Sequence, residues 1–242
     1  MELVASELNI SSYRKIPTLS VTHRKSSQKP EASWLDREAS SSILDSGTAT
    51  AQVSPHELTT KMMNAAVSMG YAEIRKGKAT GVIIEAGDIV SGVRVDNTVI
   101  SLGANDKVCI CMGPWTGVAL EDWFNLKIPM DGIKSTSLVY KDMPEMKTEP
   151  YACFCDDDQY GCHLELYPRP TGELYICGIG GSDYVNGDRL RENGDCAAAD
   201  LILADPKRVE VGRNSFKSMS TLGNKTPDIM QSCMRPCTGI VH

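Results

Sequence analysis

The stretch that decides the fold is Lys107-Val-Cys-Ile-Cys-Met-Gly-Pro-Trp-Thr116. Residues 108–112 are apolar on both faces of an extended chain, which is typical of a strand buried in a parallel sheet. Gly113 follows directly, and a glycine at a strand end lets another backbone or a ligand approach closely. The sequence therefore predicts a buried parallel strand over 107–112 whose end admits such an approach.

The residues before this strand predict a helix over 55–70. Ser54 stands in the N-cap position and Pro55 at the first helical position. Glu57, three residues after the cap, fits a capping box, and Gly70 is a suitable stop. The apolar residues fit one face of this helix: Leu58, Met62, Met63, Ala65, Ala66 and Met69.

Most other predicted elements are strands. A meander is expected between the helix and residue 107, because Gly87-Asp88 and Asp96-Asn97 are turn pairs between apolar runs. The strands predicted along the chain cover residues 16–22, 72–75, 79–85, 89–95, 98–102, 134–140, 162–166 and 174–177. A second helix is expected around 197–204, ended by Pro206.

Composition excludes several classes of protein. The 242 residues carry a net charge of −6 and a pI of about 5.3, which argues against general binding of nucleic acid. No stretch approaches the roughly 20 apolar residues that span a bilayer. Nine cysteines without a visible secretion signal predict reduced thiols and a cytoplasmic location.

Two motifs could bind a ligand by residue type, but the sequence favours a structural role for each. Cys177-Gly-Ile-Gly-Gly181 resembles a phosphate loop, but no helix start follows it, so a turn or bulge is favoured. Four further residues are of types that bind zinc. Their spacing matches no standard zinc motif, so the sequence predicts no metal site. These residues are Cys153, Cys155, Cys162 and His163.

Two arginines are candidates for binding a carboxylate. Arg169 and Arg235 each precede a proline and lie beside a predicted strand or the chain end. An arginine held on a rigid strand end can grip a carboxylate with two hydrogen bonds. The alternative is a structural arginine that pairs with a neighbouring acid, and the sequence leaves both open.

Taken in order, these motifs resemble the D-amino-acid-oxidase-like family of FAD-dependent oxidoreductases, in its fungal and protist branch. The resemblance covers about residues 1–239 and includes the helix, the meander and the stretch 107–116. Further matching segments are Trp34-Leu-Asp36, Gly47-Thr-Ala-Thr-Ala-Gln-Val-Ser-Pro55, residues 164–178 and Cys233-Met-Arg-Pro236.

The resemblance implies an α/β fold of the α+β kind. An incomplete FAD/NAD(P)-binding Rossmann-like domain would be interleaved with a substrate domain built on an antiparallel sheet. Segments 13–50 and 127–182 would belong to the substrate domain, and segments 51–126 and 183–242 to the FAD domain. This division makes the chain 1–242 a partial FAD-dependent oxidoreductase domain.

The resemblance also implies an activity. It would be oxidation of a C–N bond next to a carboxylate in an amine or amino-acid substrate, with hydride transfer to the flavin. Gly113, Pro114 and Trp115 would lie against FAD, whereas Arg169 and Arg235 would bind the substrate carboxylate.

Two expected family motifs are absent from the sequence. No G-x-G-x-x-G motif precedes the matching region, and no Asp-Gly-x-Pro-x-Ile-Gly follows Arg235-Pro236. The resulting hypothesis is a fragment of a longer flavoprotein, cut at both ends, whose own affinity for FAD is low. The alternative is a catalytically inactive form that binds a protein partner through unpaired sheet edges. A metal-binding module is a third, weaker possibility.

Overall fold

The computed structural model describes residues 1–22 and 29–238, and its contacts divide the chain into two compact units. Unit 1 consists of Met1–Ala72, Ser135–Asp183 and Leu203–Cys233. Unit 2 consists of Glu73–Lys134, Tyr184–Ile202 and Met234–His242. In the described part of the chain, no helix is both long and apolar enough to cross a bilayer.

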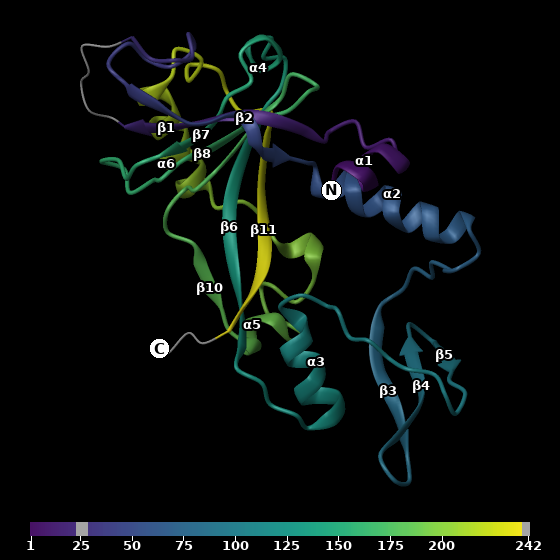
Figure 1. Ribbon diagram of the computed structural model, residues 1–242. Helices are drawn as coiled ribbons and strands as arrows, with labels where there is room; N and C mark the ends of the chain where they lie inside the picture. Colours follow the sequence, from purple (N-terminus) through teal and green to yellow (C-terminus); the bar gives the residue numbers. More distant parts are fainter. Residues whose placement is uncertain (23–28, 239–242) are drawn as a thin grey trace. The chain divides into compact units, whose positions relative to one another are not determined.

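Unit 1 is built around a mixed sheet, three of whose strands also contain residues of unit 2, namely 130–134, 184–185 and 234–238. The eight-stranded sheet has the order β10-β6-β9-β8-β7-β1-β2, and β11 pairs with β6 (Figure 1). Its strands are β1 Arg14–Thr22, β2 Ser40–Gln52, β6 Met130–Tyr140, β7 Ala152–Cys155, β8 Glu165–Pro168, β9 Leu174–Cys177, β10 Asp183–Val185 and β11 Ile229–Thr238. The helices of unit 1 are α1 Glu2–Glu7, α2 Pro55–Ser68, α4 Glu145–Thr148 and α6 Pro206–Met219.

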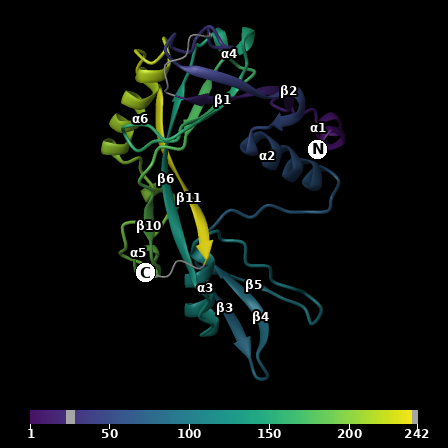
Figure 2. The same ribbon diagram turned by 60° about the vertical axis from the view of Figure 1, so that its left-hand side comes forward.

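Most neighbouring strands of this sheet run antiparallel, whereas β1 and β7 run parallel. β1 lies between β2, antiparallel to it, and β7, parallel to it with Leu19 opposite Cys153. The core includes the buried side chains Leu138 and Tyr140 from β6, and α6 contributes Phe216, whose ring centroid lies 5.1 Å from that of Tyr140. Figure 2 shows α6 beside β6. The predicted α+β class is therefore confirmed.

Unit 2 contains a separate three-stranded sheet and short helices. Its elements are β3 Ala79–Glu85, β4 Ile89–Val95, β5 Thr98–Ser101, α3 Trp115–Phe124, α5 Gly187–Leu190 and the 3₁₀ helix η1 Ala199–Leu201. The strands pair in chain order, so the predicted meander is confirmed. Asp88 and Asp96 have φ angles of 59° and 49° in its two turns, where aspartate tolerates a left-handed conformation.

The buried parallel strand predicted over 107–112 is wrong. These residues, all of which the structure describes, belong to no strand, and Val108 is 38% exposed. Cys109 and Cys111 are also exposed. An apolar run becomes a strand only where another strand satisfies its backbone groups, and the described part of the chain brings none beside this segment.

Other boundaries also differ from the sequence predictions. Residues 72–75 form no strand, and the strand expected over 162–166 begins later, as β8. The helix expected around 197–204 is reduced to η1. Pro206 does not end that helix but begins α6, because Asp205 caps the new helix by accepting a hydrogen bond from the Lys207 N–H at 2.8 Å.

Helix α2 is confirmed, but its contacts differ from those that the sequence suggests. None of residues 55–68, all of them described, is buried, and Met62 is 51% exposed. Ser54 makes no side-chain capping bond. Glu57 does not complete a capping box; its two carboxylate oxygens accept hydrogen bonds from the backbone N–H groups of Ser11 and Ser12, both at 2.8 Å.

This carboxylate makes the docking of residues 11–12 on α2 sensitive to pH. Hydrogen bonds from Lys61, Ser12 and Ser11 lower the pKa of Glu57 below its usual range. A lowered pKa means that the contact is fully present above the unfolded-state value of about 4.3 and is lost as the pH falls through the lower folded-state value.

We expect the backbone N–H resonances of Ser11 and Ser12 to keep their positions from pH 7 to pH 5 and to move only in stronger acid. Glu57→Gln should abolish that movement, because the glutamine amide does not titrate. An NMR titration of both proteins checks this. Movement of the wild-type resonances centred at or above the ordinary glutamate pKa of about 4.3 would contradict the contact.

Candidate functional site

A cavity of about 560 Å³ in unit 1 is the candidate site. Its wall combines the segment that leads into α2 with the hairpin β8–β9. The lining residues are Ser12, Ala51, Gln52, Val53, Ser54, Pro55, His56, Tyr167, Arg169, Pro170, Tyr175 and Gln231. Most ligand cavities join apolar and aromatic walls to a few polar groups, and this one has that character.

Arg169 is held at the cavity by its own hairpin. It begins the turn between β8 and β9, where its N–H donates to the Glu173 carbonyl at 2.7 Å and its carbonyl accepts from the Gly172 N–H at 3.0 Å. Gly172 has a φ of +90°, so the turn expected here is confirmed. The short hairpin fixes the direction of the arginine side chain.

The Arg169 guanidinium has two partners on the same hairpin. Its carbon lies 5.4 Å from the centroid of the Tyr175 ring, and Nη1 donates to Glu173 Oε2 at 3.1 Å. The structural pairing considered from the sequence is therefore present. That hydrogen bond uses one of five N–H donors, and the side chain is 35% exposed, so a planar anion can still approach it.

Aromatic rings and a carboxylate extend the site along β8 and β9. The Tyr167 hydroxyl donates to Glu165 Oε2 at 2.6 Å, and the ring centroids of Tyr167 and Tyr175 lie 6.3 Å apart. Burial, and then the hydrogen bond to Glu165, raise the pKa of Tyr167. The phenol therefore stays protonated at neutral pH, and its ring offers an uncharged wall.

Gln52 is a residue that the sequence analysis did not identify. Its Nε2 donates to the Pro168 carbonyl, which also accepts from Arg14 Nη2 at 2.7 Å. Its Oε1 is buried and has no hydrogen-bond partner among the described residues. A buried acceptor left unpaired costs about 1–3 kcal/mol, so this oxygen favours a ligand that brings an N–H or O–H donor.

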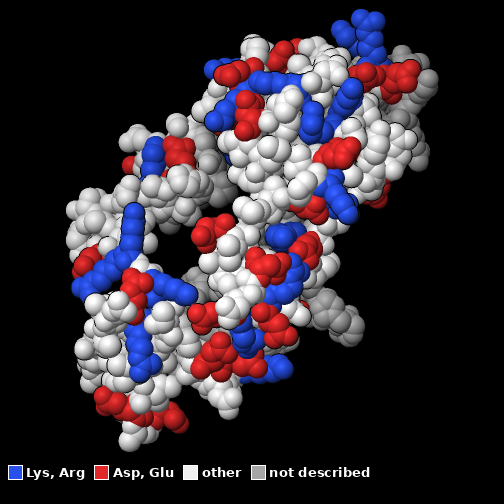
Figure 3. Space-filling model, turned by 180° about the vertical axis from the view of Figure 1, so that it is seen from behind, with Lys and Arg blue, Asp and Glu red and all other residues white. Residues whose placement is uncertain are grey.

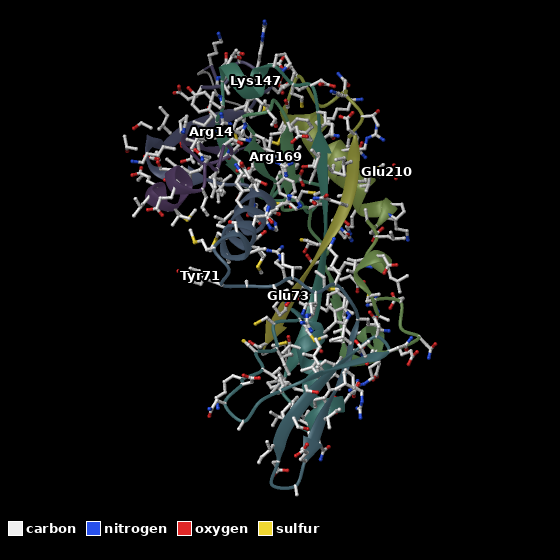
Figure 4. The ribbon with its side chains drawn as sticks, turned by 90° about the vertical axis from the view of Figure 1, so that its right-hand side faces the viewer. Arg14, Tyr71, Glu73, Lys147, Arg169 and Glu210 are labelled. Carbon is white, nitrogen blue, oxygen red and sulfur yellow. The ribbon has the colours of Figure 1, made fainter. Side chains whose placement is uncertain are left out.

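Arg14 and Arg169 are labelled in Figure 4, and Arg14 Nη2 donates to the carbonyl of Pro168, the residue directly before Arg169. Burial lowers the pKa of Arg14, which nevertheless remains charged at neutral pH. The only sequence signal for Gln52 was its place just before Ser54 and Pro55, in a segment that also matched the family. The pairing that orients Gln52 joins positions 116 residues apart, so no local pattern reveals it.

The three residues expected beside the flavin lead into α3 in unit 2, whose first residue is Trp115 and whose N-cap is Pro114. Gly113 has a φ of +57°, and a β-carbon added there would meet nothing within 4 Å. Pro114 is buried, and the Trp115 indole Nε1 donates to the Cys196 carbonyl at 3.0 Å. The proline and tryptophan thus have structural contacts, whereas the glycine leaves open space. Their contact with FAD stays a prediction.

Arg235 is placed differently from Arg169. It lies within β11 and is exposed, and it belongs to unit 2, whereas Arg169 belongs to unit 1. The cavity of unit 1 is lined by Arg169 but not by Arg235. The structure therefore does not bring the two arginines together within one unit, and a role for Arg235 stays a prediction.

The structure does not support the two weaker interpretations of the sequence, a zinc site and a phosphate-binding loop. Among residues 1–22 and 29–238, no group of three or more histidines, cysteines or acids is placed to hold a metal ion. Cys153 is fully buried, and burial raises the pKa of its thiol. In the glycine stretch, the Gly178 carbonyl accepts the His163 N–H at 3.0 Å, so this segment is a backbone-paired turn.

The described residues do not fit the pyrophosphate half of FAD. That group needs a glycine-rich turn between a strand and a helix N-terminus. The described chain contains no such turn: α2 follows Ser54-Pro55, and α3 follows an exposed segment that is not a strand. The N-terminus of α6 is occupied by the Asp205 carboxylate, which would repel a phosphate.

Known proteins resemble this chain in sequence and in fold. TDA3 from Saccharomyces cerevisiae, which carries a provisional description as an oxidoreductase, is 27% identical over 182 residues, covering 61% of this chain and 33% of TDA3. L-proline dehydrogenase from P. horikoshii superposes with a TM-score of 0.67 at 14% identity, covering 96% of this chain and 63% of that one. Glycine oxidase from Geobacillus kaustophilus gives 0.67 at 13% identity, covering 98% and 63%.

The solved structures show a similar fold, whereas the family profile shows the family. The two structures show a shared fold, and the chain spans a third of TDA3 and less than two thirds of each of the two structures. The family profile described as FAD dependent oxidoreductase matches residues 11–228. Because that match covers most of the 242 residues, the chain belongs to the family of FAD-dependent oxidoreductases.

Proposed function

We propose that this chain carries the substrate-binding part of a flavin-dependent oxidoreductase that acts on an amine or amino acid. The bond oxidised is a C–N bond next to a carboxylate, and FAD, when bound, supplies the hydride acceptor. Membership of the family supports the reaction class. The observation that carries the substrate class is Arg169, an arginine backed by the Tyr175 ring at the wall of a cavity.

The cavity offers complementary groups for the two ends of an amino acid. Arg169 would receive the carboxylate, because a guanidinium binds a planar anion with parallel hydrogen bonds. Gln52 Oε1, buried without a partner among the described residues, would accept an N–H of the amine. The rings of Tyr167 and Tyr175 would hold the carbon skeleton and exclude water from it. These roles position a substrate and involve no transfer of protons.

Binding of matched small molecules tests this proposal on the chain itself. L-Proline has both a carboxylate and an amine, pyrrolidine lacks the carboxylate, and cyclopentanecarboxylate lacks the amine. We expect NMR titration to show the tightest binding for L-proline and the weakest for pyrrolidine. Arg169→Lys should weaken the binding of L-proline about tenfold, because lysine loses the two-pronged contact.

Arg213→Lys is the matched control. It makes the same exchange at an exposed position of α6 that does not line the cavity, so binding should be unchanged. Equal affinity of wild type and Arg169→Lys for L-proline would remove Arg169 from the site. Equal affinity for L-proline and pyrrolidine would argue against a carboxylate substrate and leave the partner-binding alternative.

A further inference from the structure

Two exposed thiols lie together just before α3. The Sγ atoms of Cys109 and Cys111 are 3.4 Å apart, and both side chains are exposed. Three of the other cysteines, namely Cys153, Cys162 and Cys196, are buried. We infer that Cys109 and Cys111 form a redox-active dithiol that closes reversibly to a disulfide when it reacts with a peroxide.

The backbone around the two thiols can bend to close the ring. Residues two apart in a fully extended chain have Cα atoms about 6.6 Å apart, at the upper end of the range of roughly 4.4–6.8 Å that disulfides show. Closure therefore needs a slight contraction of the segment. Residues 107–112 are in no strand, so this contraction breaks no hydrogen bond of a sheet.

The two thiols have different roles in the chemistry. The hydrogen bond with Cys109, and then its charge, raise the pKa of Cys111, so Cys111 holds its proton more tightly and acts as the second thiol to react. The Cys109 thiolate attacks one peroxide oxygen, the O–O bond breaks, and Cys109 becomes a sulfenic acid. Cys111 sulfur then attacks the Cys109 sulfur, and hydroxide leaves. With hydrogen peroxide, two thiols lose two electrons and two protons in total, and two water molecules form.

The site differs from the other thiols of the chain in exposure and in reactivity. Burial raises the pKa of Cys153, Cys155 and Cys162, which keeps these three thiols protonated and shielded from a peroxide. Closure at 109–111 would act directly on the start of α3, because the Met112 N–H donates to Thr116 Oγ1 at 3.0 Å. The redox state of this pair would thus change the conformation of the segment that leads to Gly113.

Peptide mapping tests the inference on the whole chain. Trypsin releases residues 108–127, which contain Cys109 and Cys111 as their only cysteines, and residues 148–189, which contain Cys153, Cys155, Cys162 and Cys177. After one equivalent of hydrogen peroxide and alkylation, we expect peptide 108–127 to take up no alkyl group and to be lighter by two hydrogen atoms. Peptide 148–189 should lose alkylation about tenfold more slowly. A thiol reductant should restore both alkylation sites of peptide 108–127.

Two variants separate ring closure from general oxidation. Cys111→Ser should stop the loss of two hydrogens and leave a sulfenic acid on Cys109 that dimedone traps. Cys177→Ser, at a half-buried thiol outside the pair, should leave closure unchanged. The inference is overturned if peptide 108–127 is still alkylated twice after treatment. It is also overturned if peptide 148–189 is oxidised as fast, or if Cys111→Ser shows the same mass loss as the wild type.

Discussion

Replacing Gly178 with alanine is expected to lower the free energy of unfolding of unit 1 by about 4 kcal/mol, a large effect for one methyl group. Gly178 has a φ of +72°, a left-handed conformation that costs an alanine about 1–2 kcal/mol. The added β-carbon would also lie 2.1 Å from the His163 carbonyl oxygen. That oxygen belongs to the backbone, so relief requires the paired segments to separate.

The separation would break a specific contact of the sheet. The His163 N–H donates to the Gly178 carbonyl at 3.0 Å, and β8 and β9 pair immediately beside this contact, with Glu165 opposite Cys177. Pushing the two backbones apart therefore disturbs the pairing that also holds Arg169 at the cavity. We expect Gly178→Ala to weaken the binding of L-proline in addition to lowering the free energy of unfolding.

Gly161→Ala is the matched control for this variant. Gly161 lies in the same unit with the same φ of +72°, but a β-carbon there meets nothing within 4 Å. Gly161→Ala should lower the free energy of unfolding only by the cost of the left-handed conformation, about 1–2 kcal/mol. Urea unfolding followed by circular dichroism compares the two variants. Equal destabilisation by Gly178→Ala and Gly161→Ala would show that the close approach at His163 is absent.

Replacing Phe216 with alanine is expected to destabilise unit 1 by a similar amount, about 3–5 kcal/mol. The side chain is fully buried and comes from α6 into the core, where its ring meets that of Tyr140. Removing it leaves a cavity that the surrounding sheet and helix fill only in part. The contact between the two rings joins α6 to β6.

Met62→Ala on α2 is the control, because it also removes a large apolar side chain from a helix of unit 1. Met62 is 51% exposed, so the expected change is within about 0.5 kcal/mol. The same urea unfolding measures both variants. A large loss of stability in Met62→Ala would mean that the apolar face of α2 is covered in the folded chain. A small loss in Phe216→Ala would contradict the packing of α6 on the sheet.

The surface carries charges of both signs. Figure 3 shows acidic and basic side chains interspersed over the face it presents, without one continuous basic surface. The net charge of −6 already argued against general binding of nucleic acid.

Local sequence patterns predicted the elements whose turns, caps or periodicity lie within their own residues. The meander β3–β5 has turn pairs between apolar runs, and α2 and β9 have clear starts or periodicity, so all of these were predicted from sequence. The order of motifs also indicated the family, which the profile match confirmed. The type of residue at Arg169 suggested an anion-binding role before its surroundings were known, and that role stays a proposal.

Only the tertiary structure decided which apolar surfaces are covered and which polar groups meet. The run 108–112 and the apolar face of α2 read as buried in isolation, but burial depends on what another segment brings alongside. Long-range packing also made β2, set Gln52 against Pro168, and joined Tyr140 to Phe216. Backbone hydrogen bonds and side-chain burial can be satisfied by residues far along the chain, so a local pattern fixes the capacity for an element but not its partner.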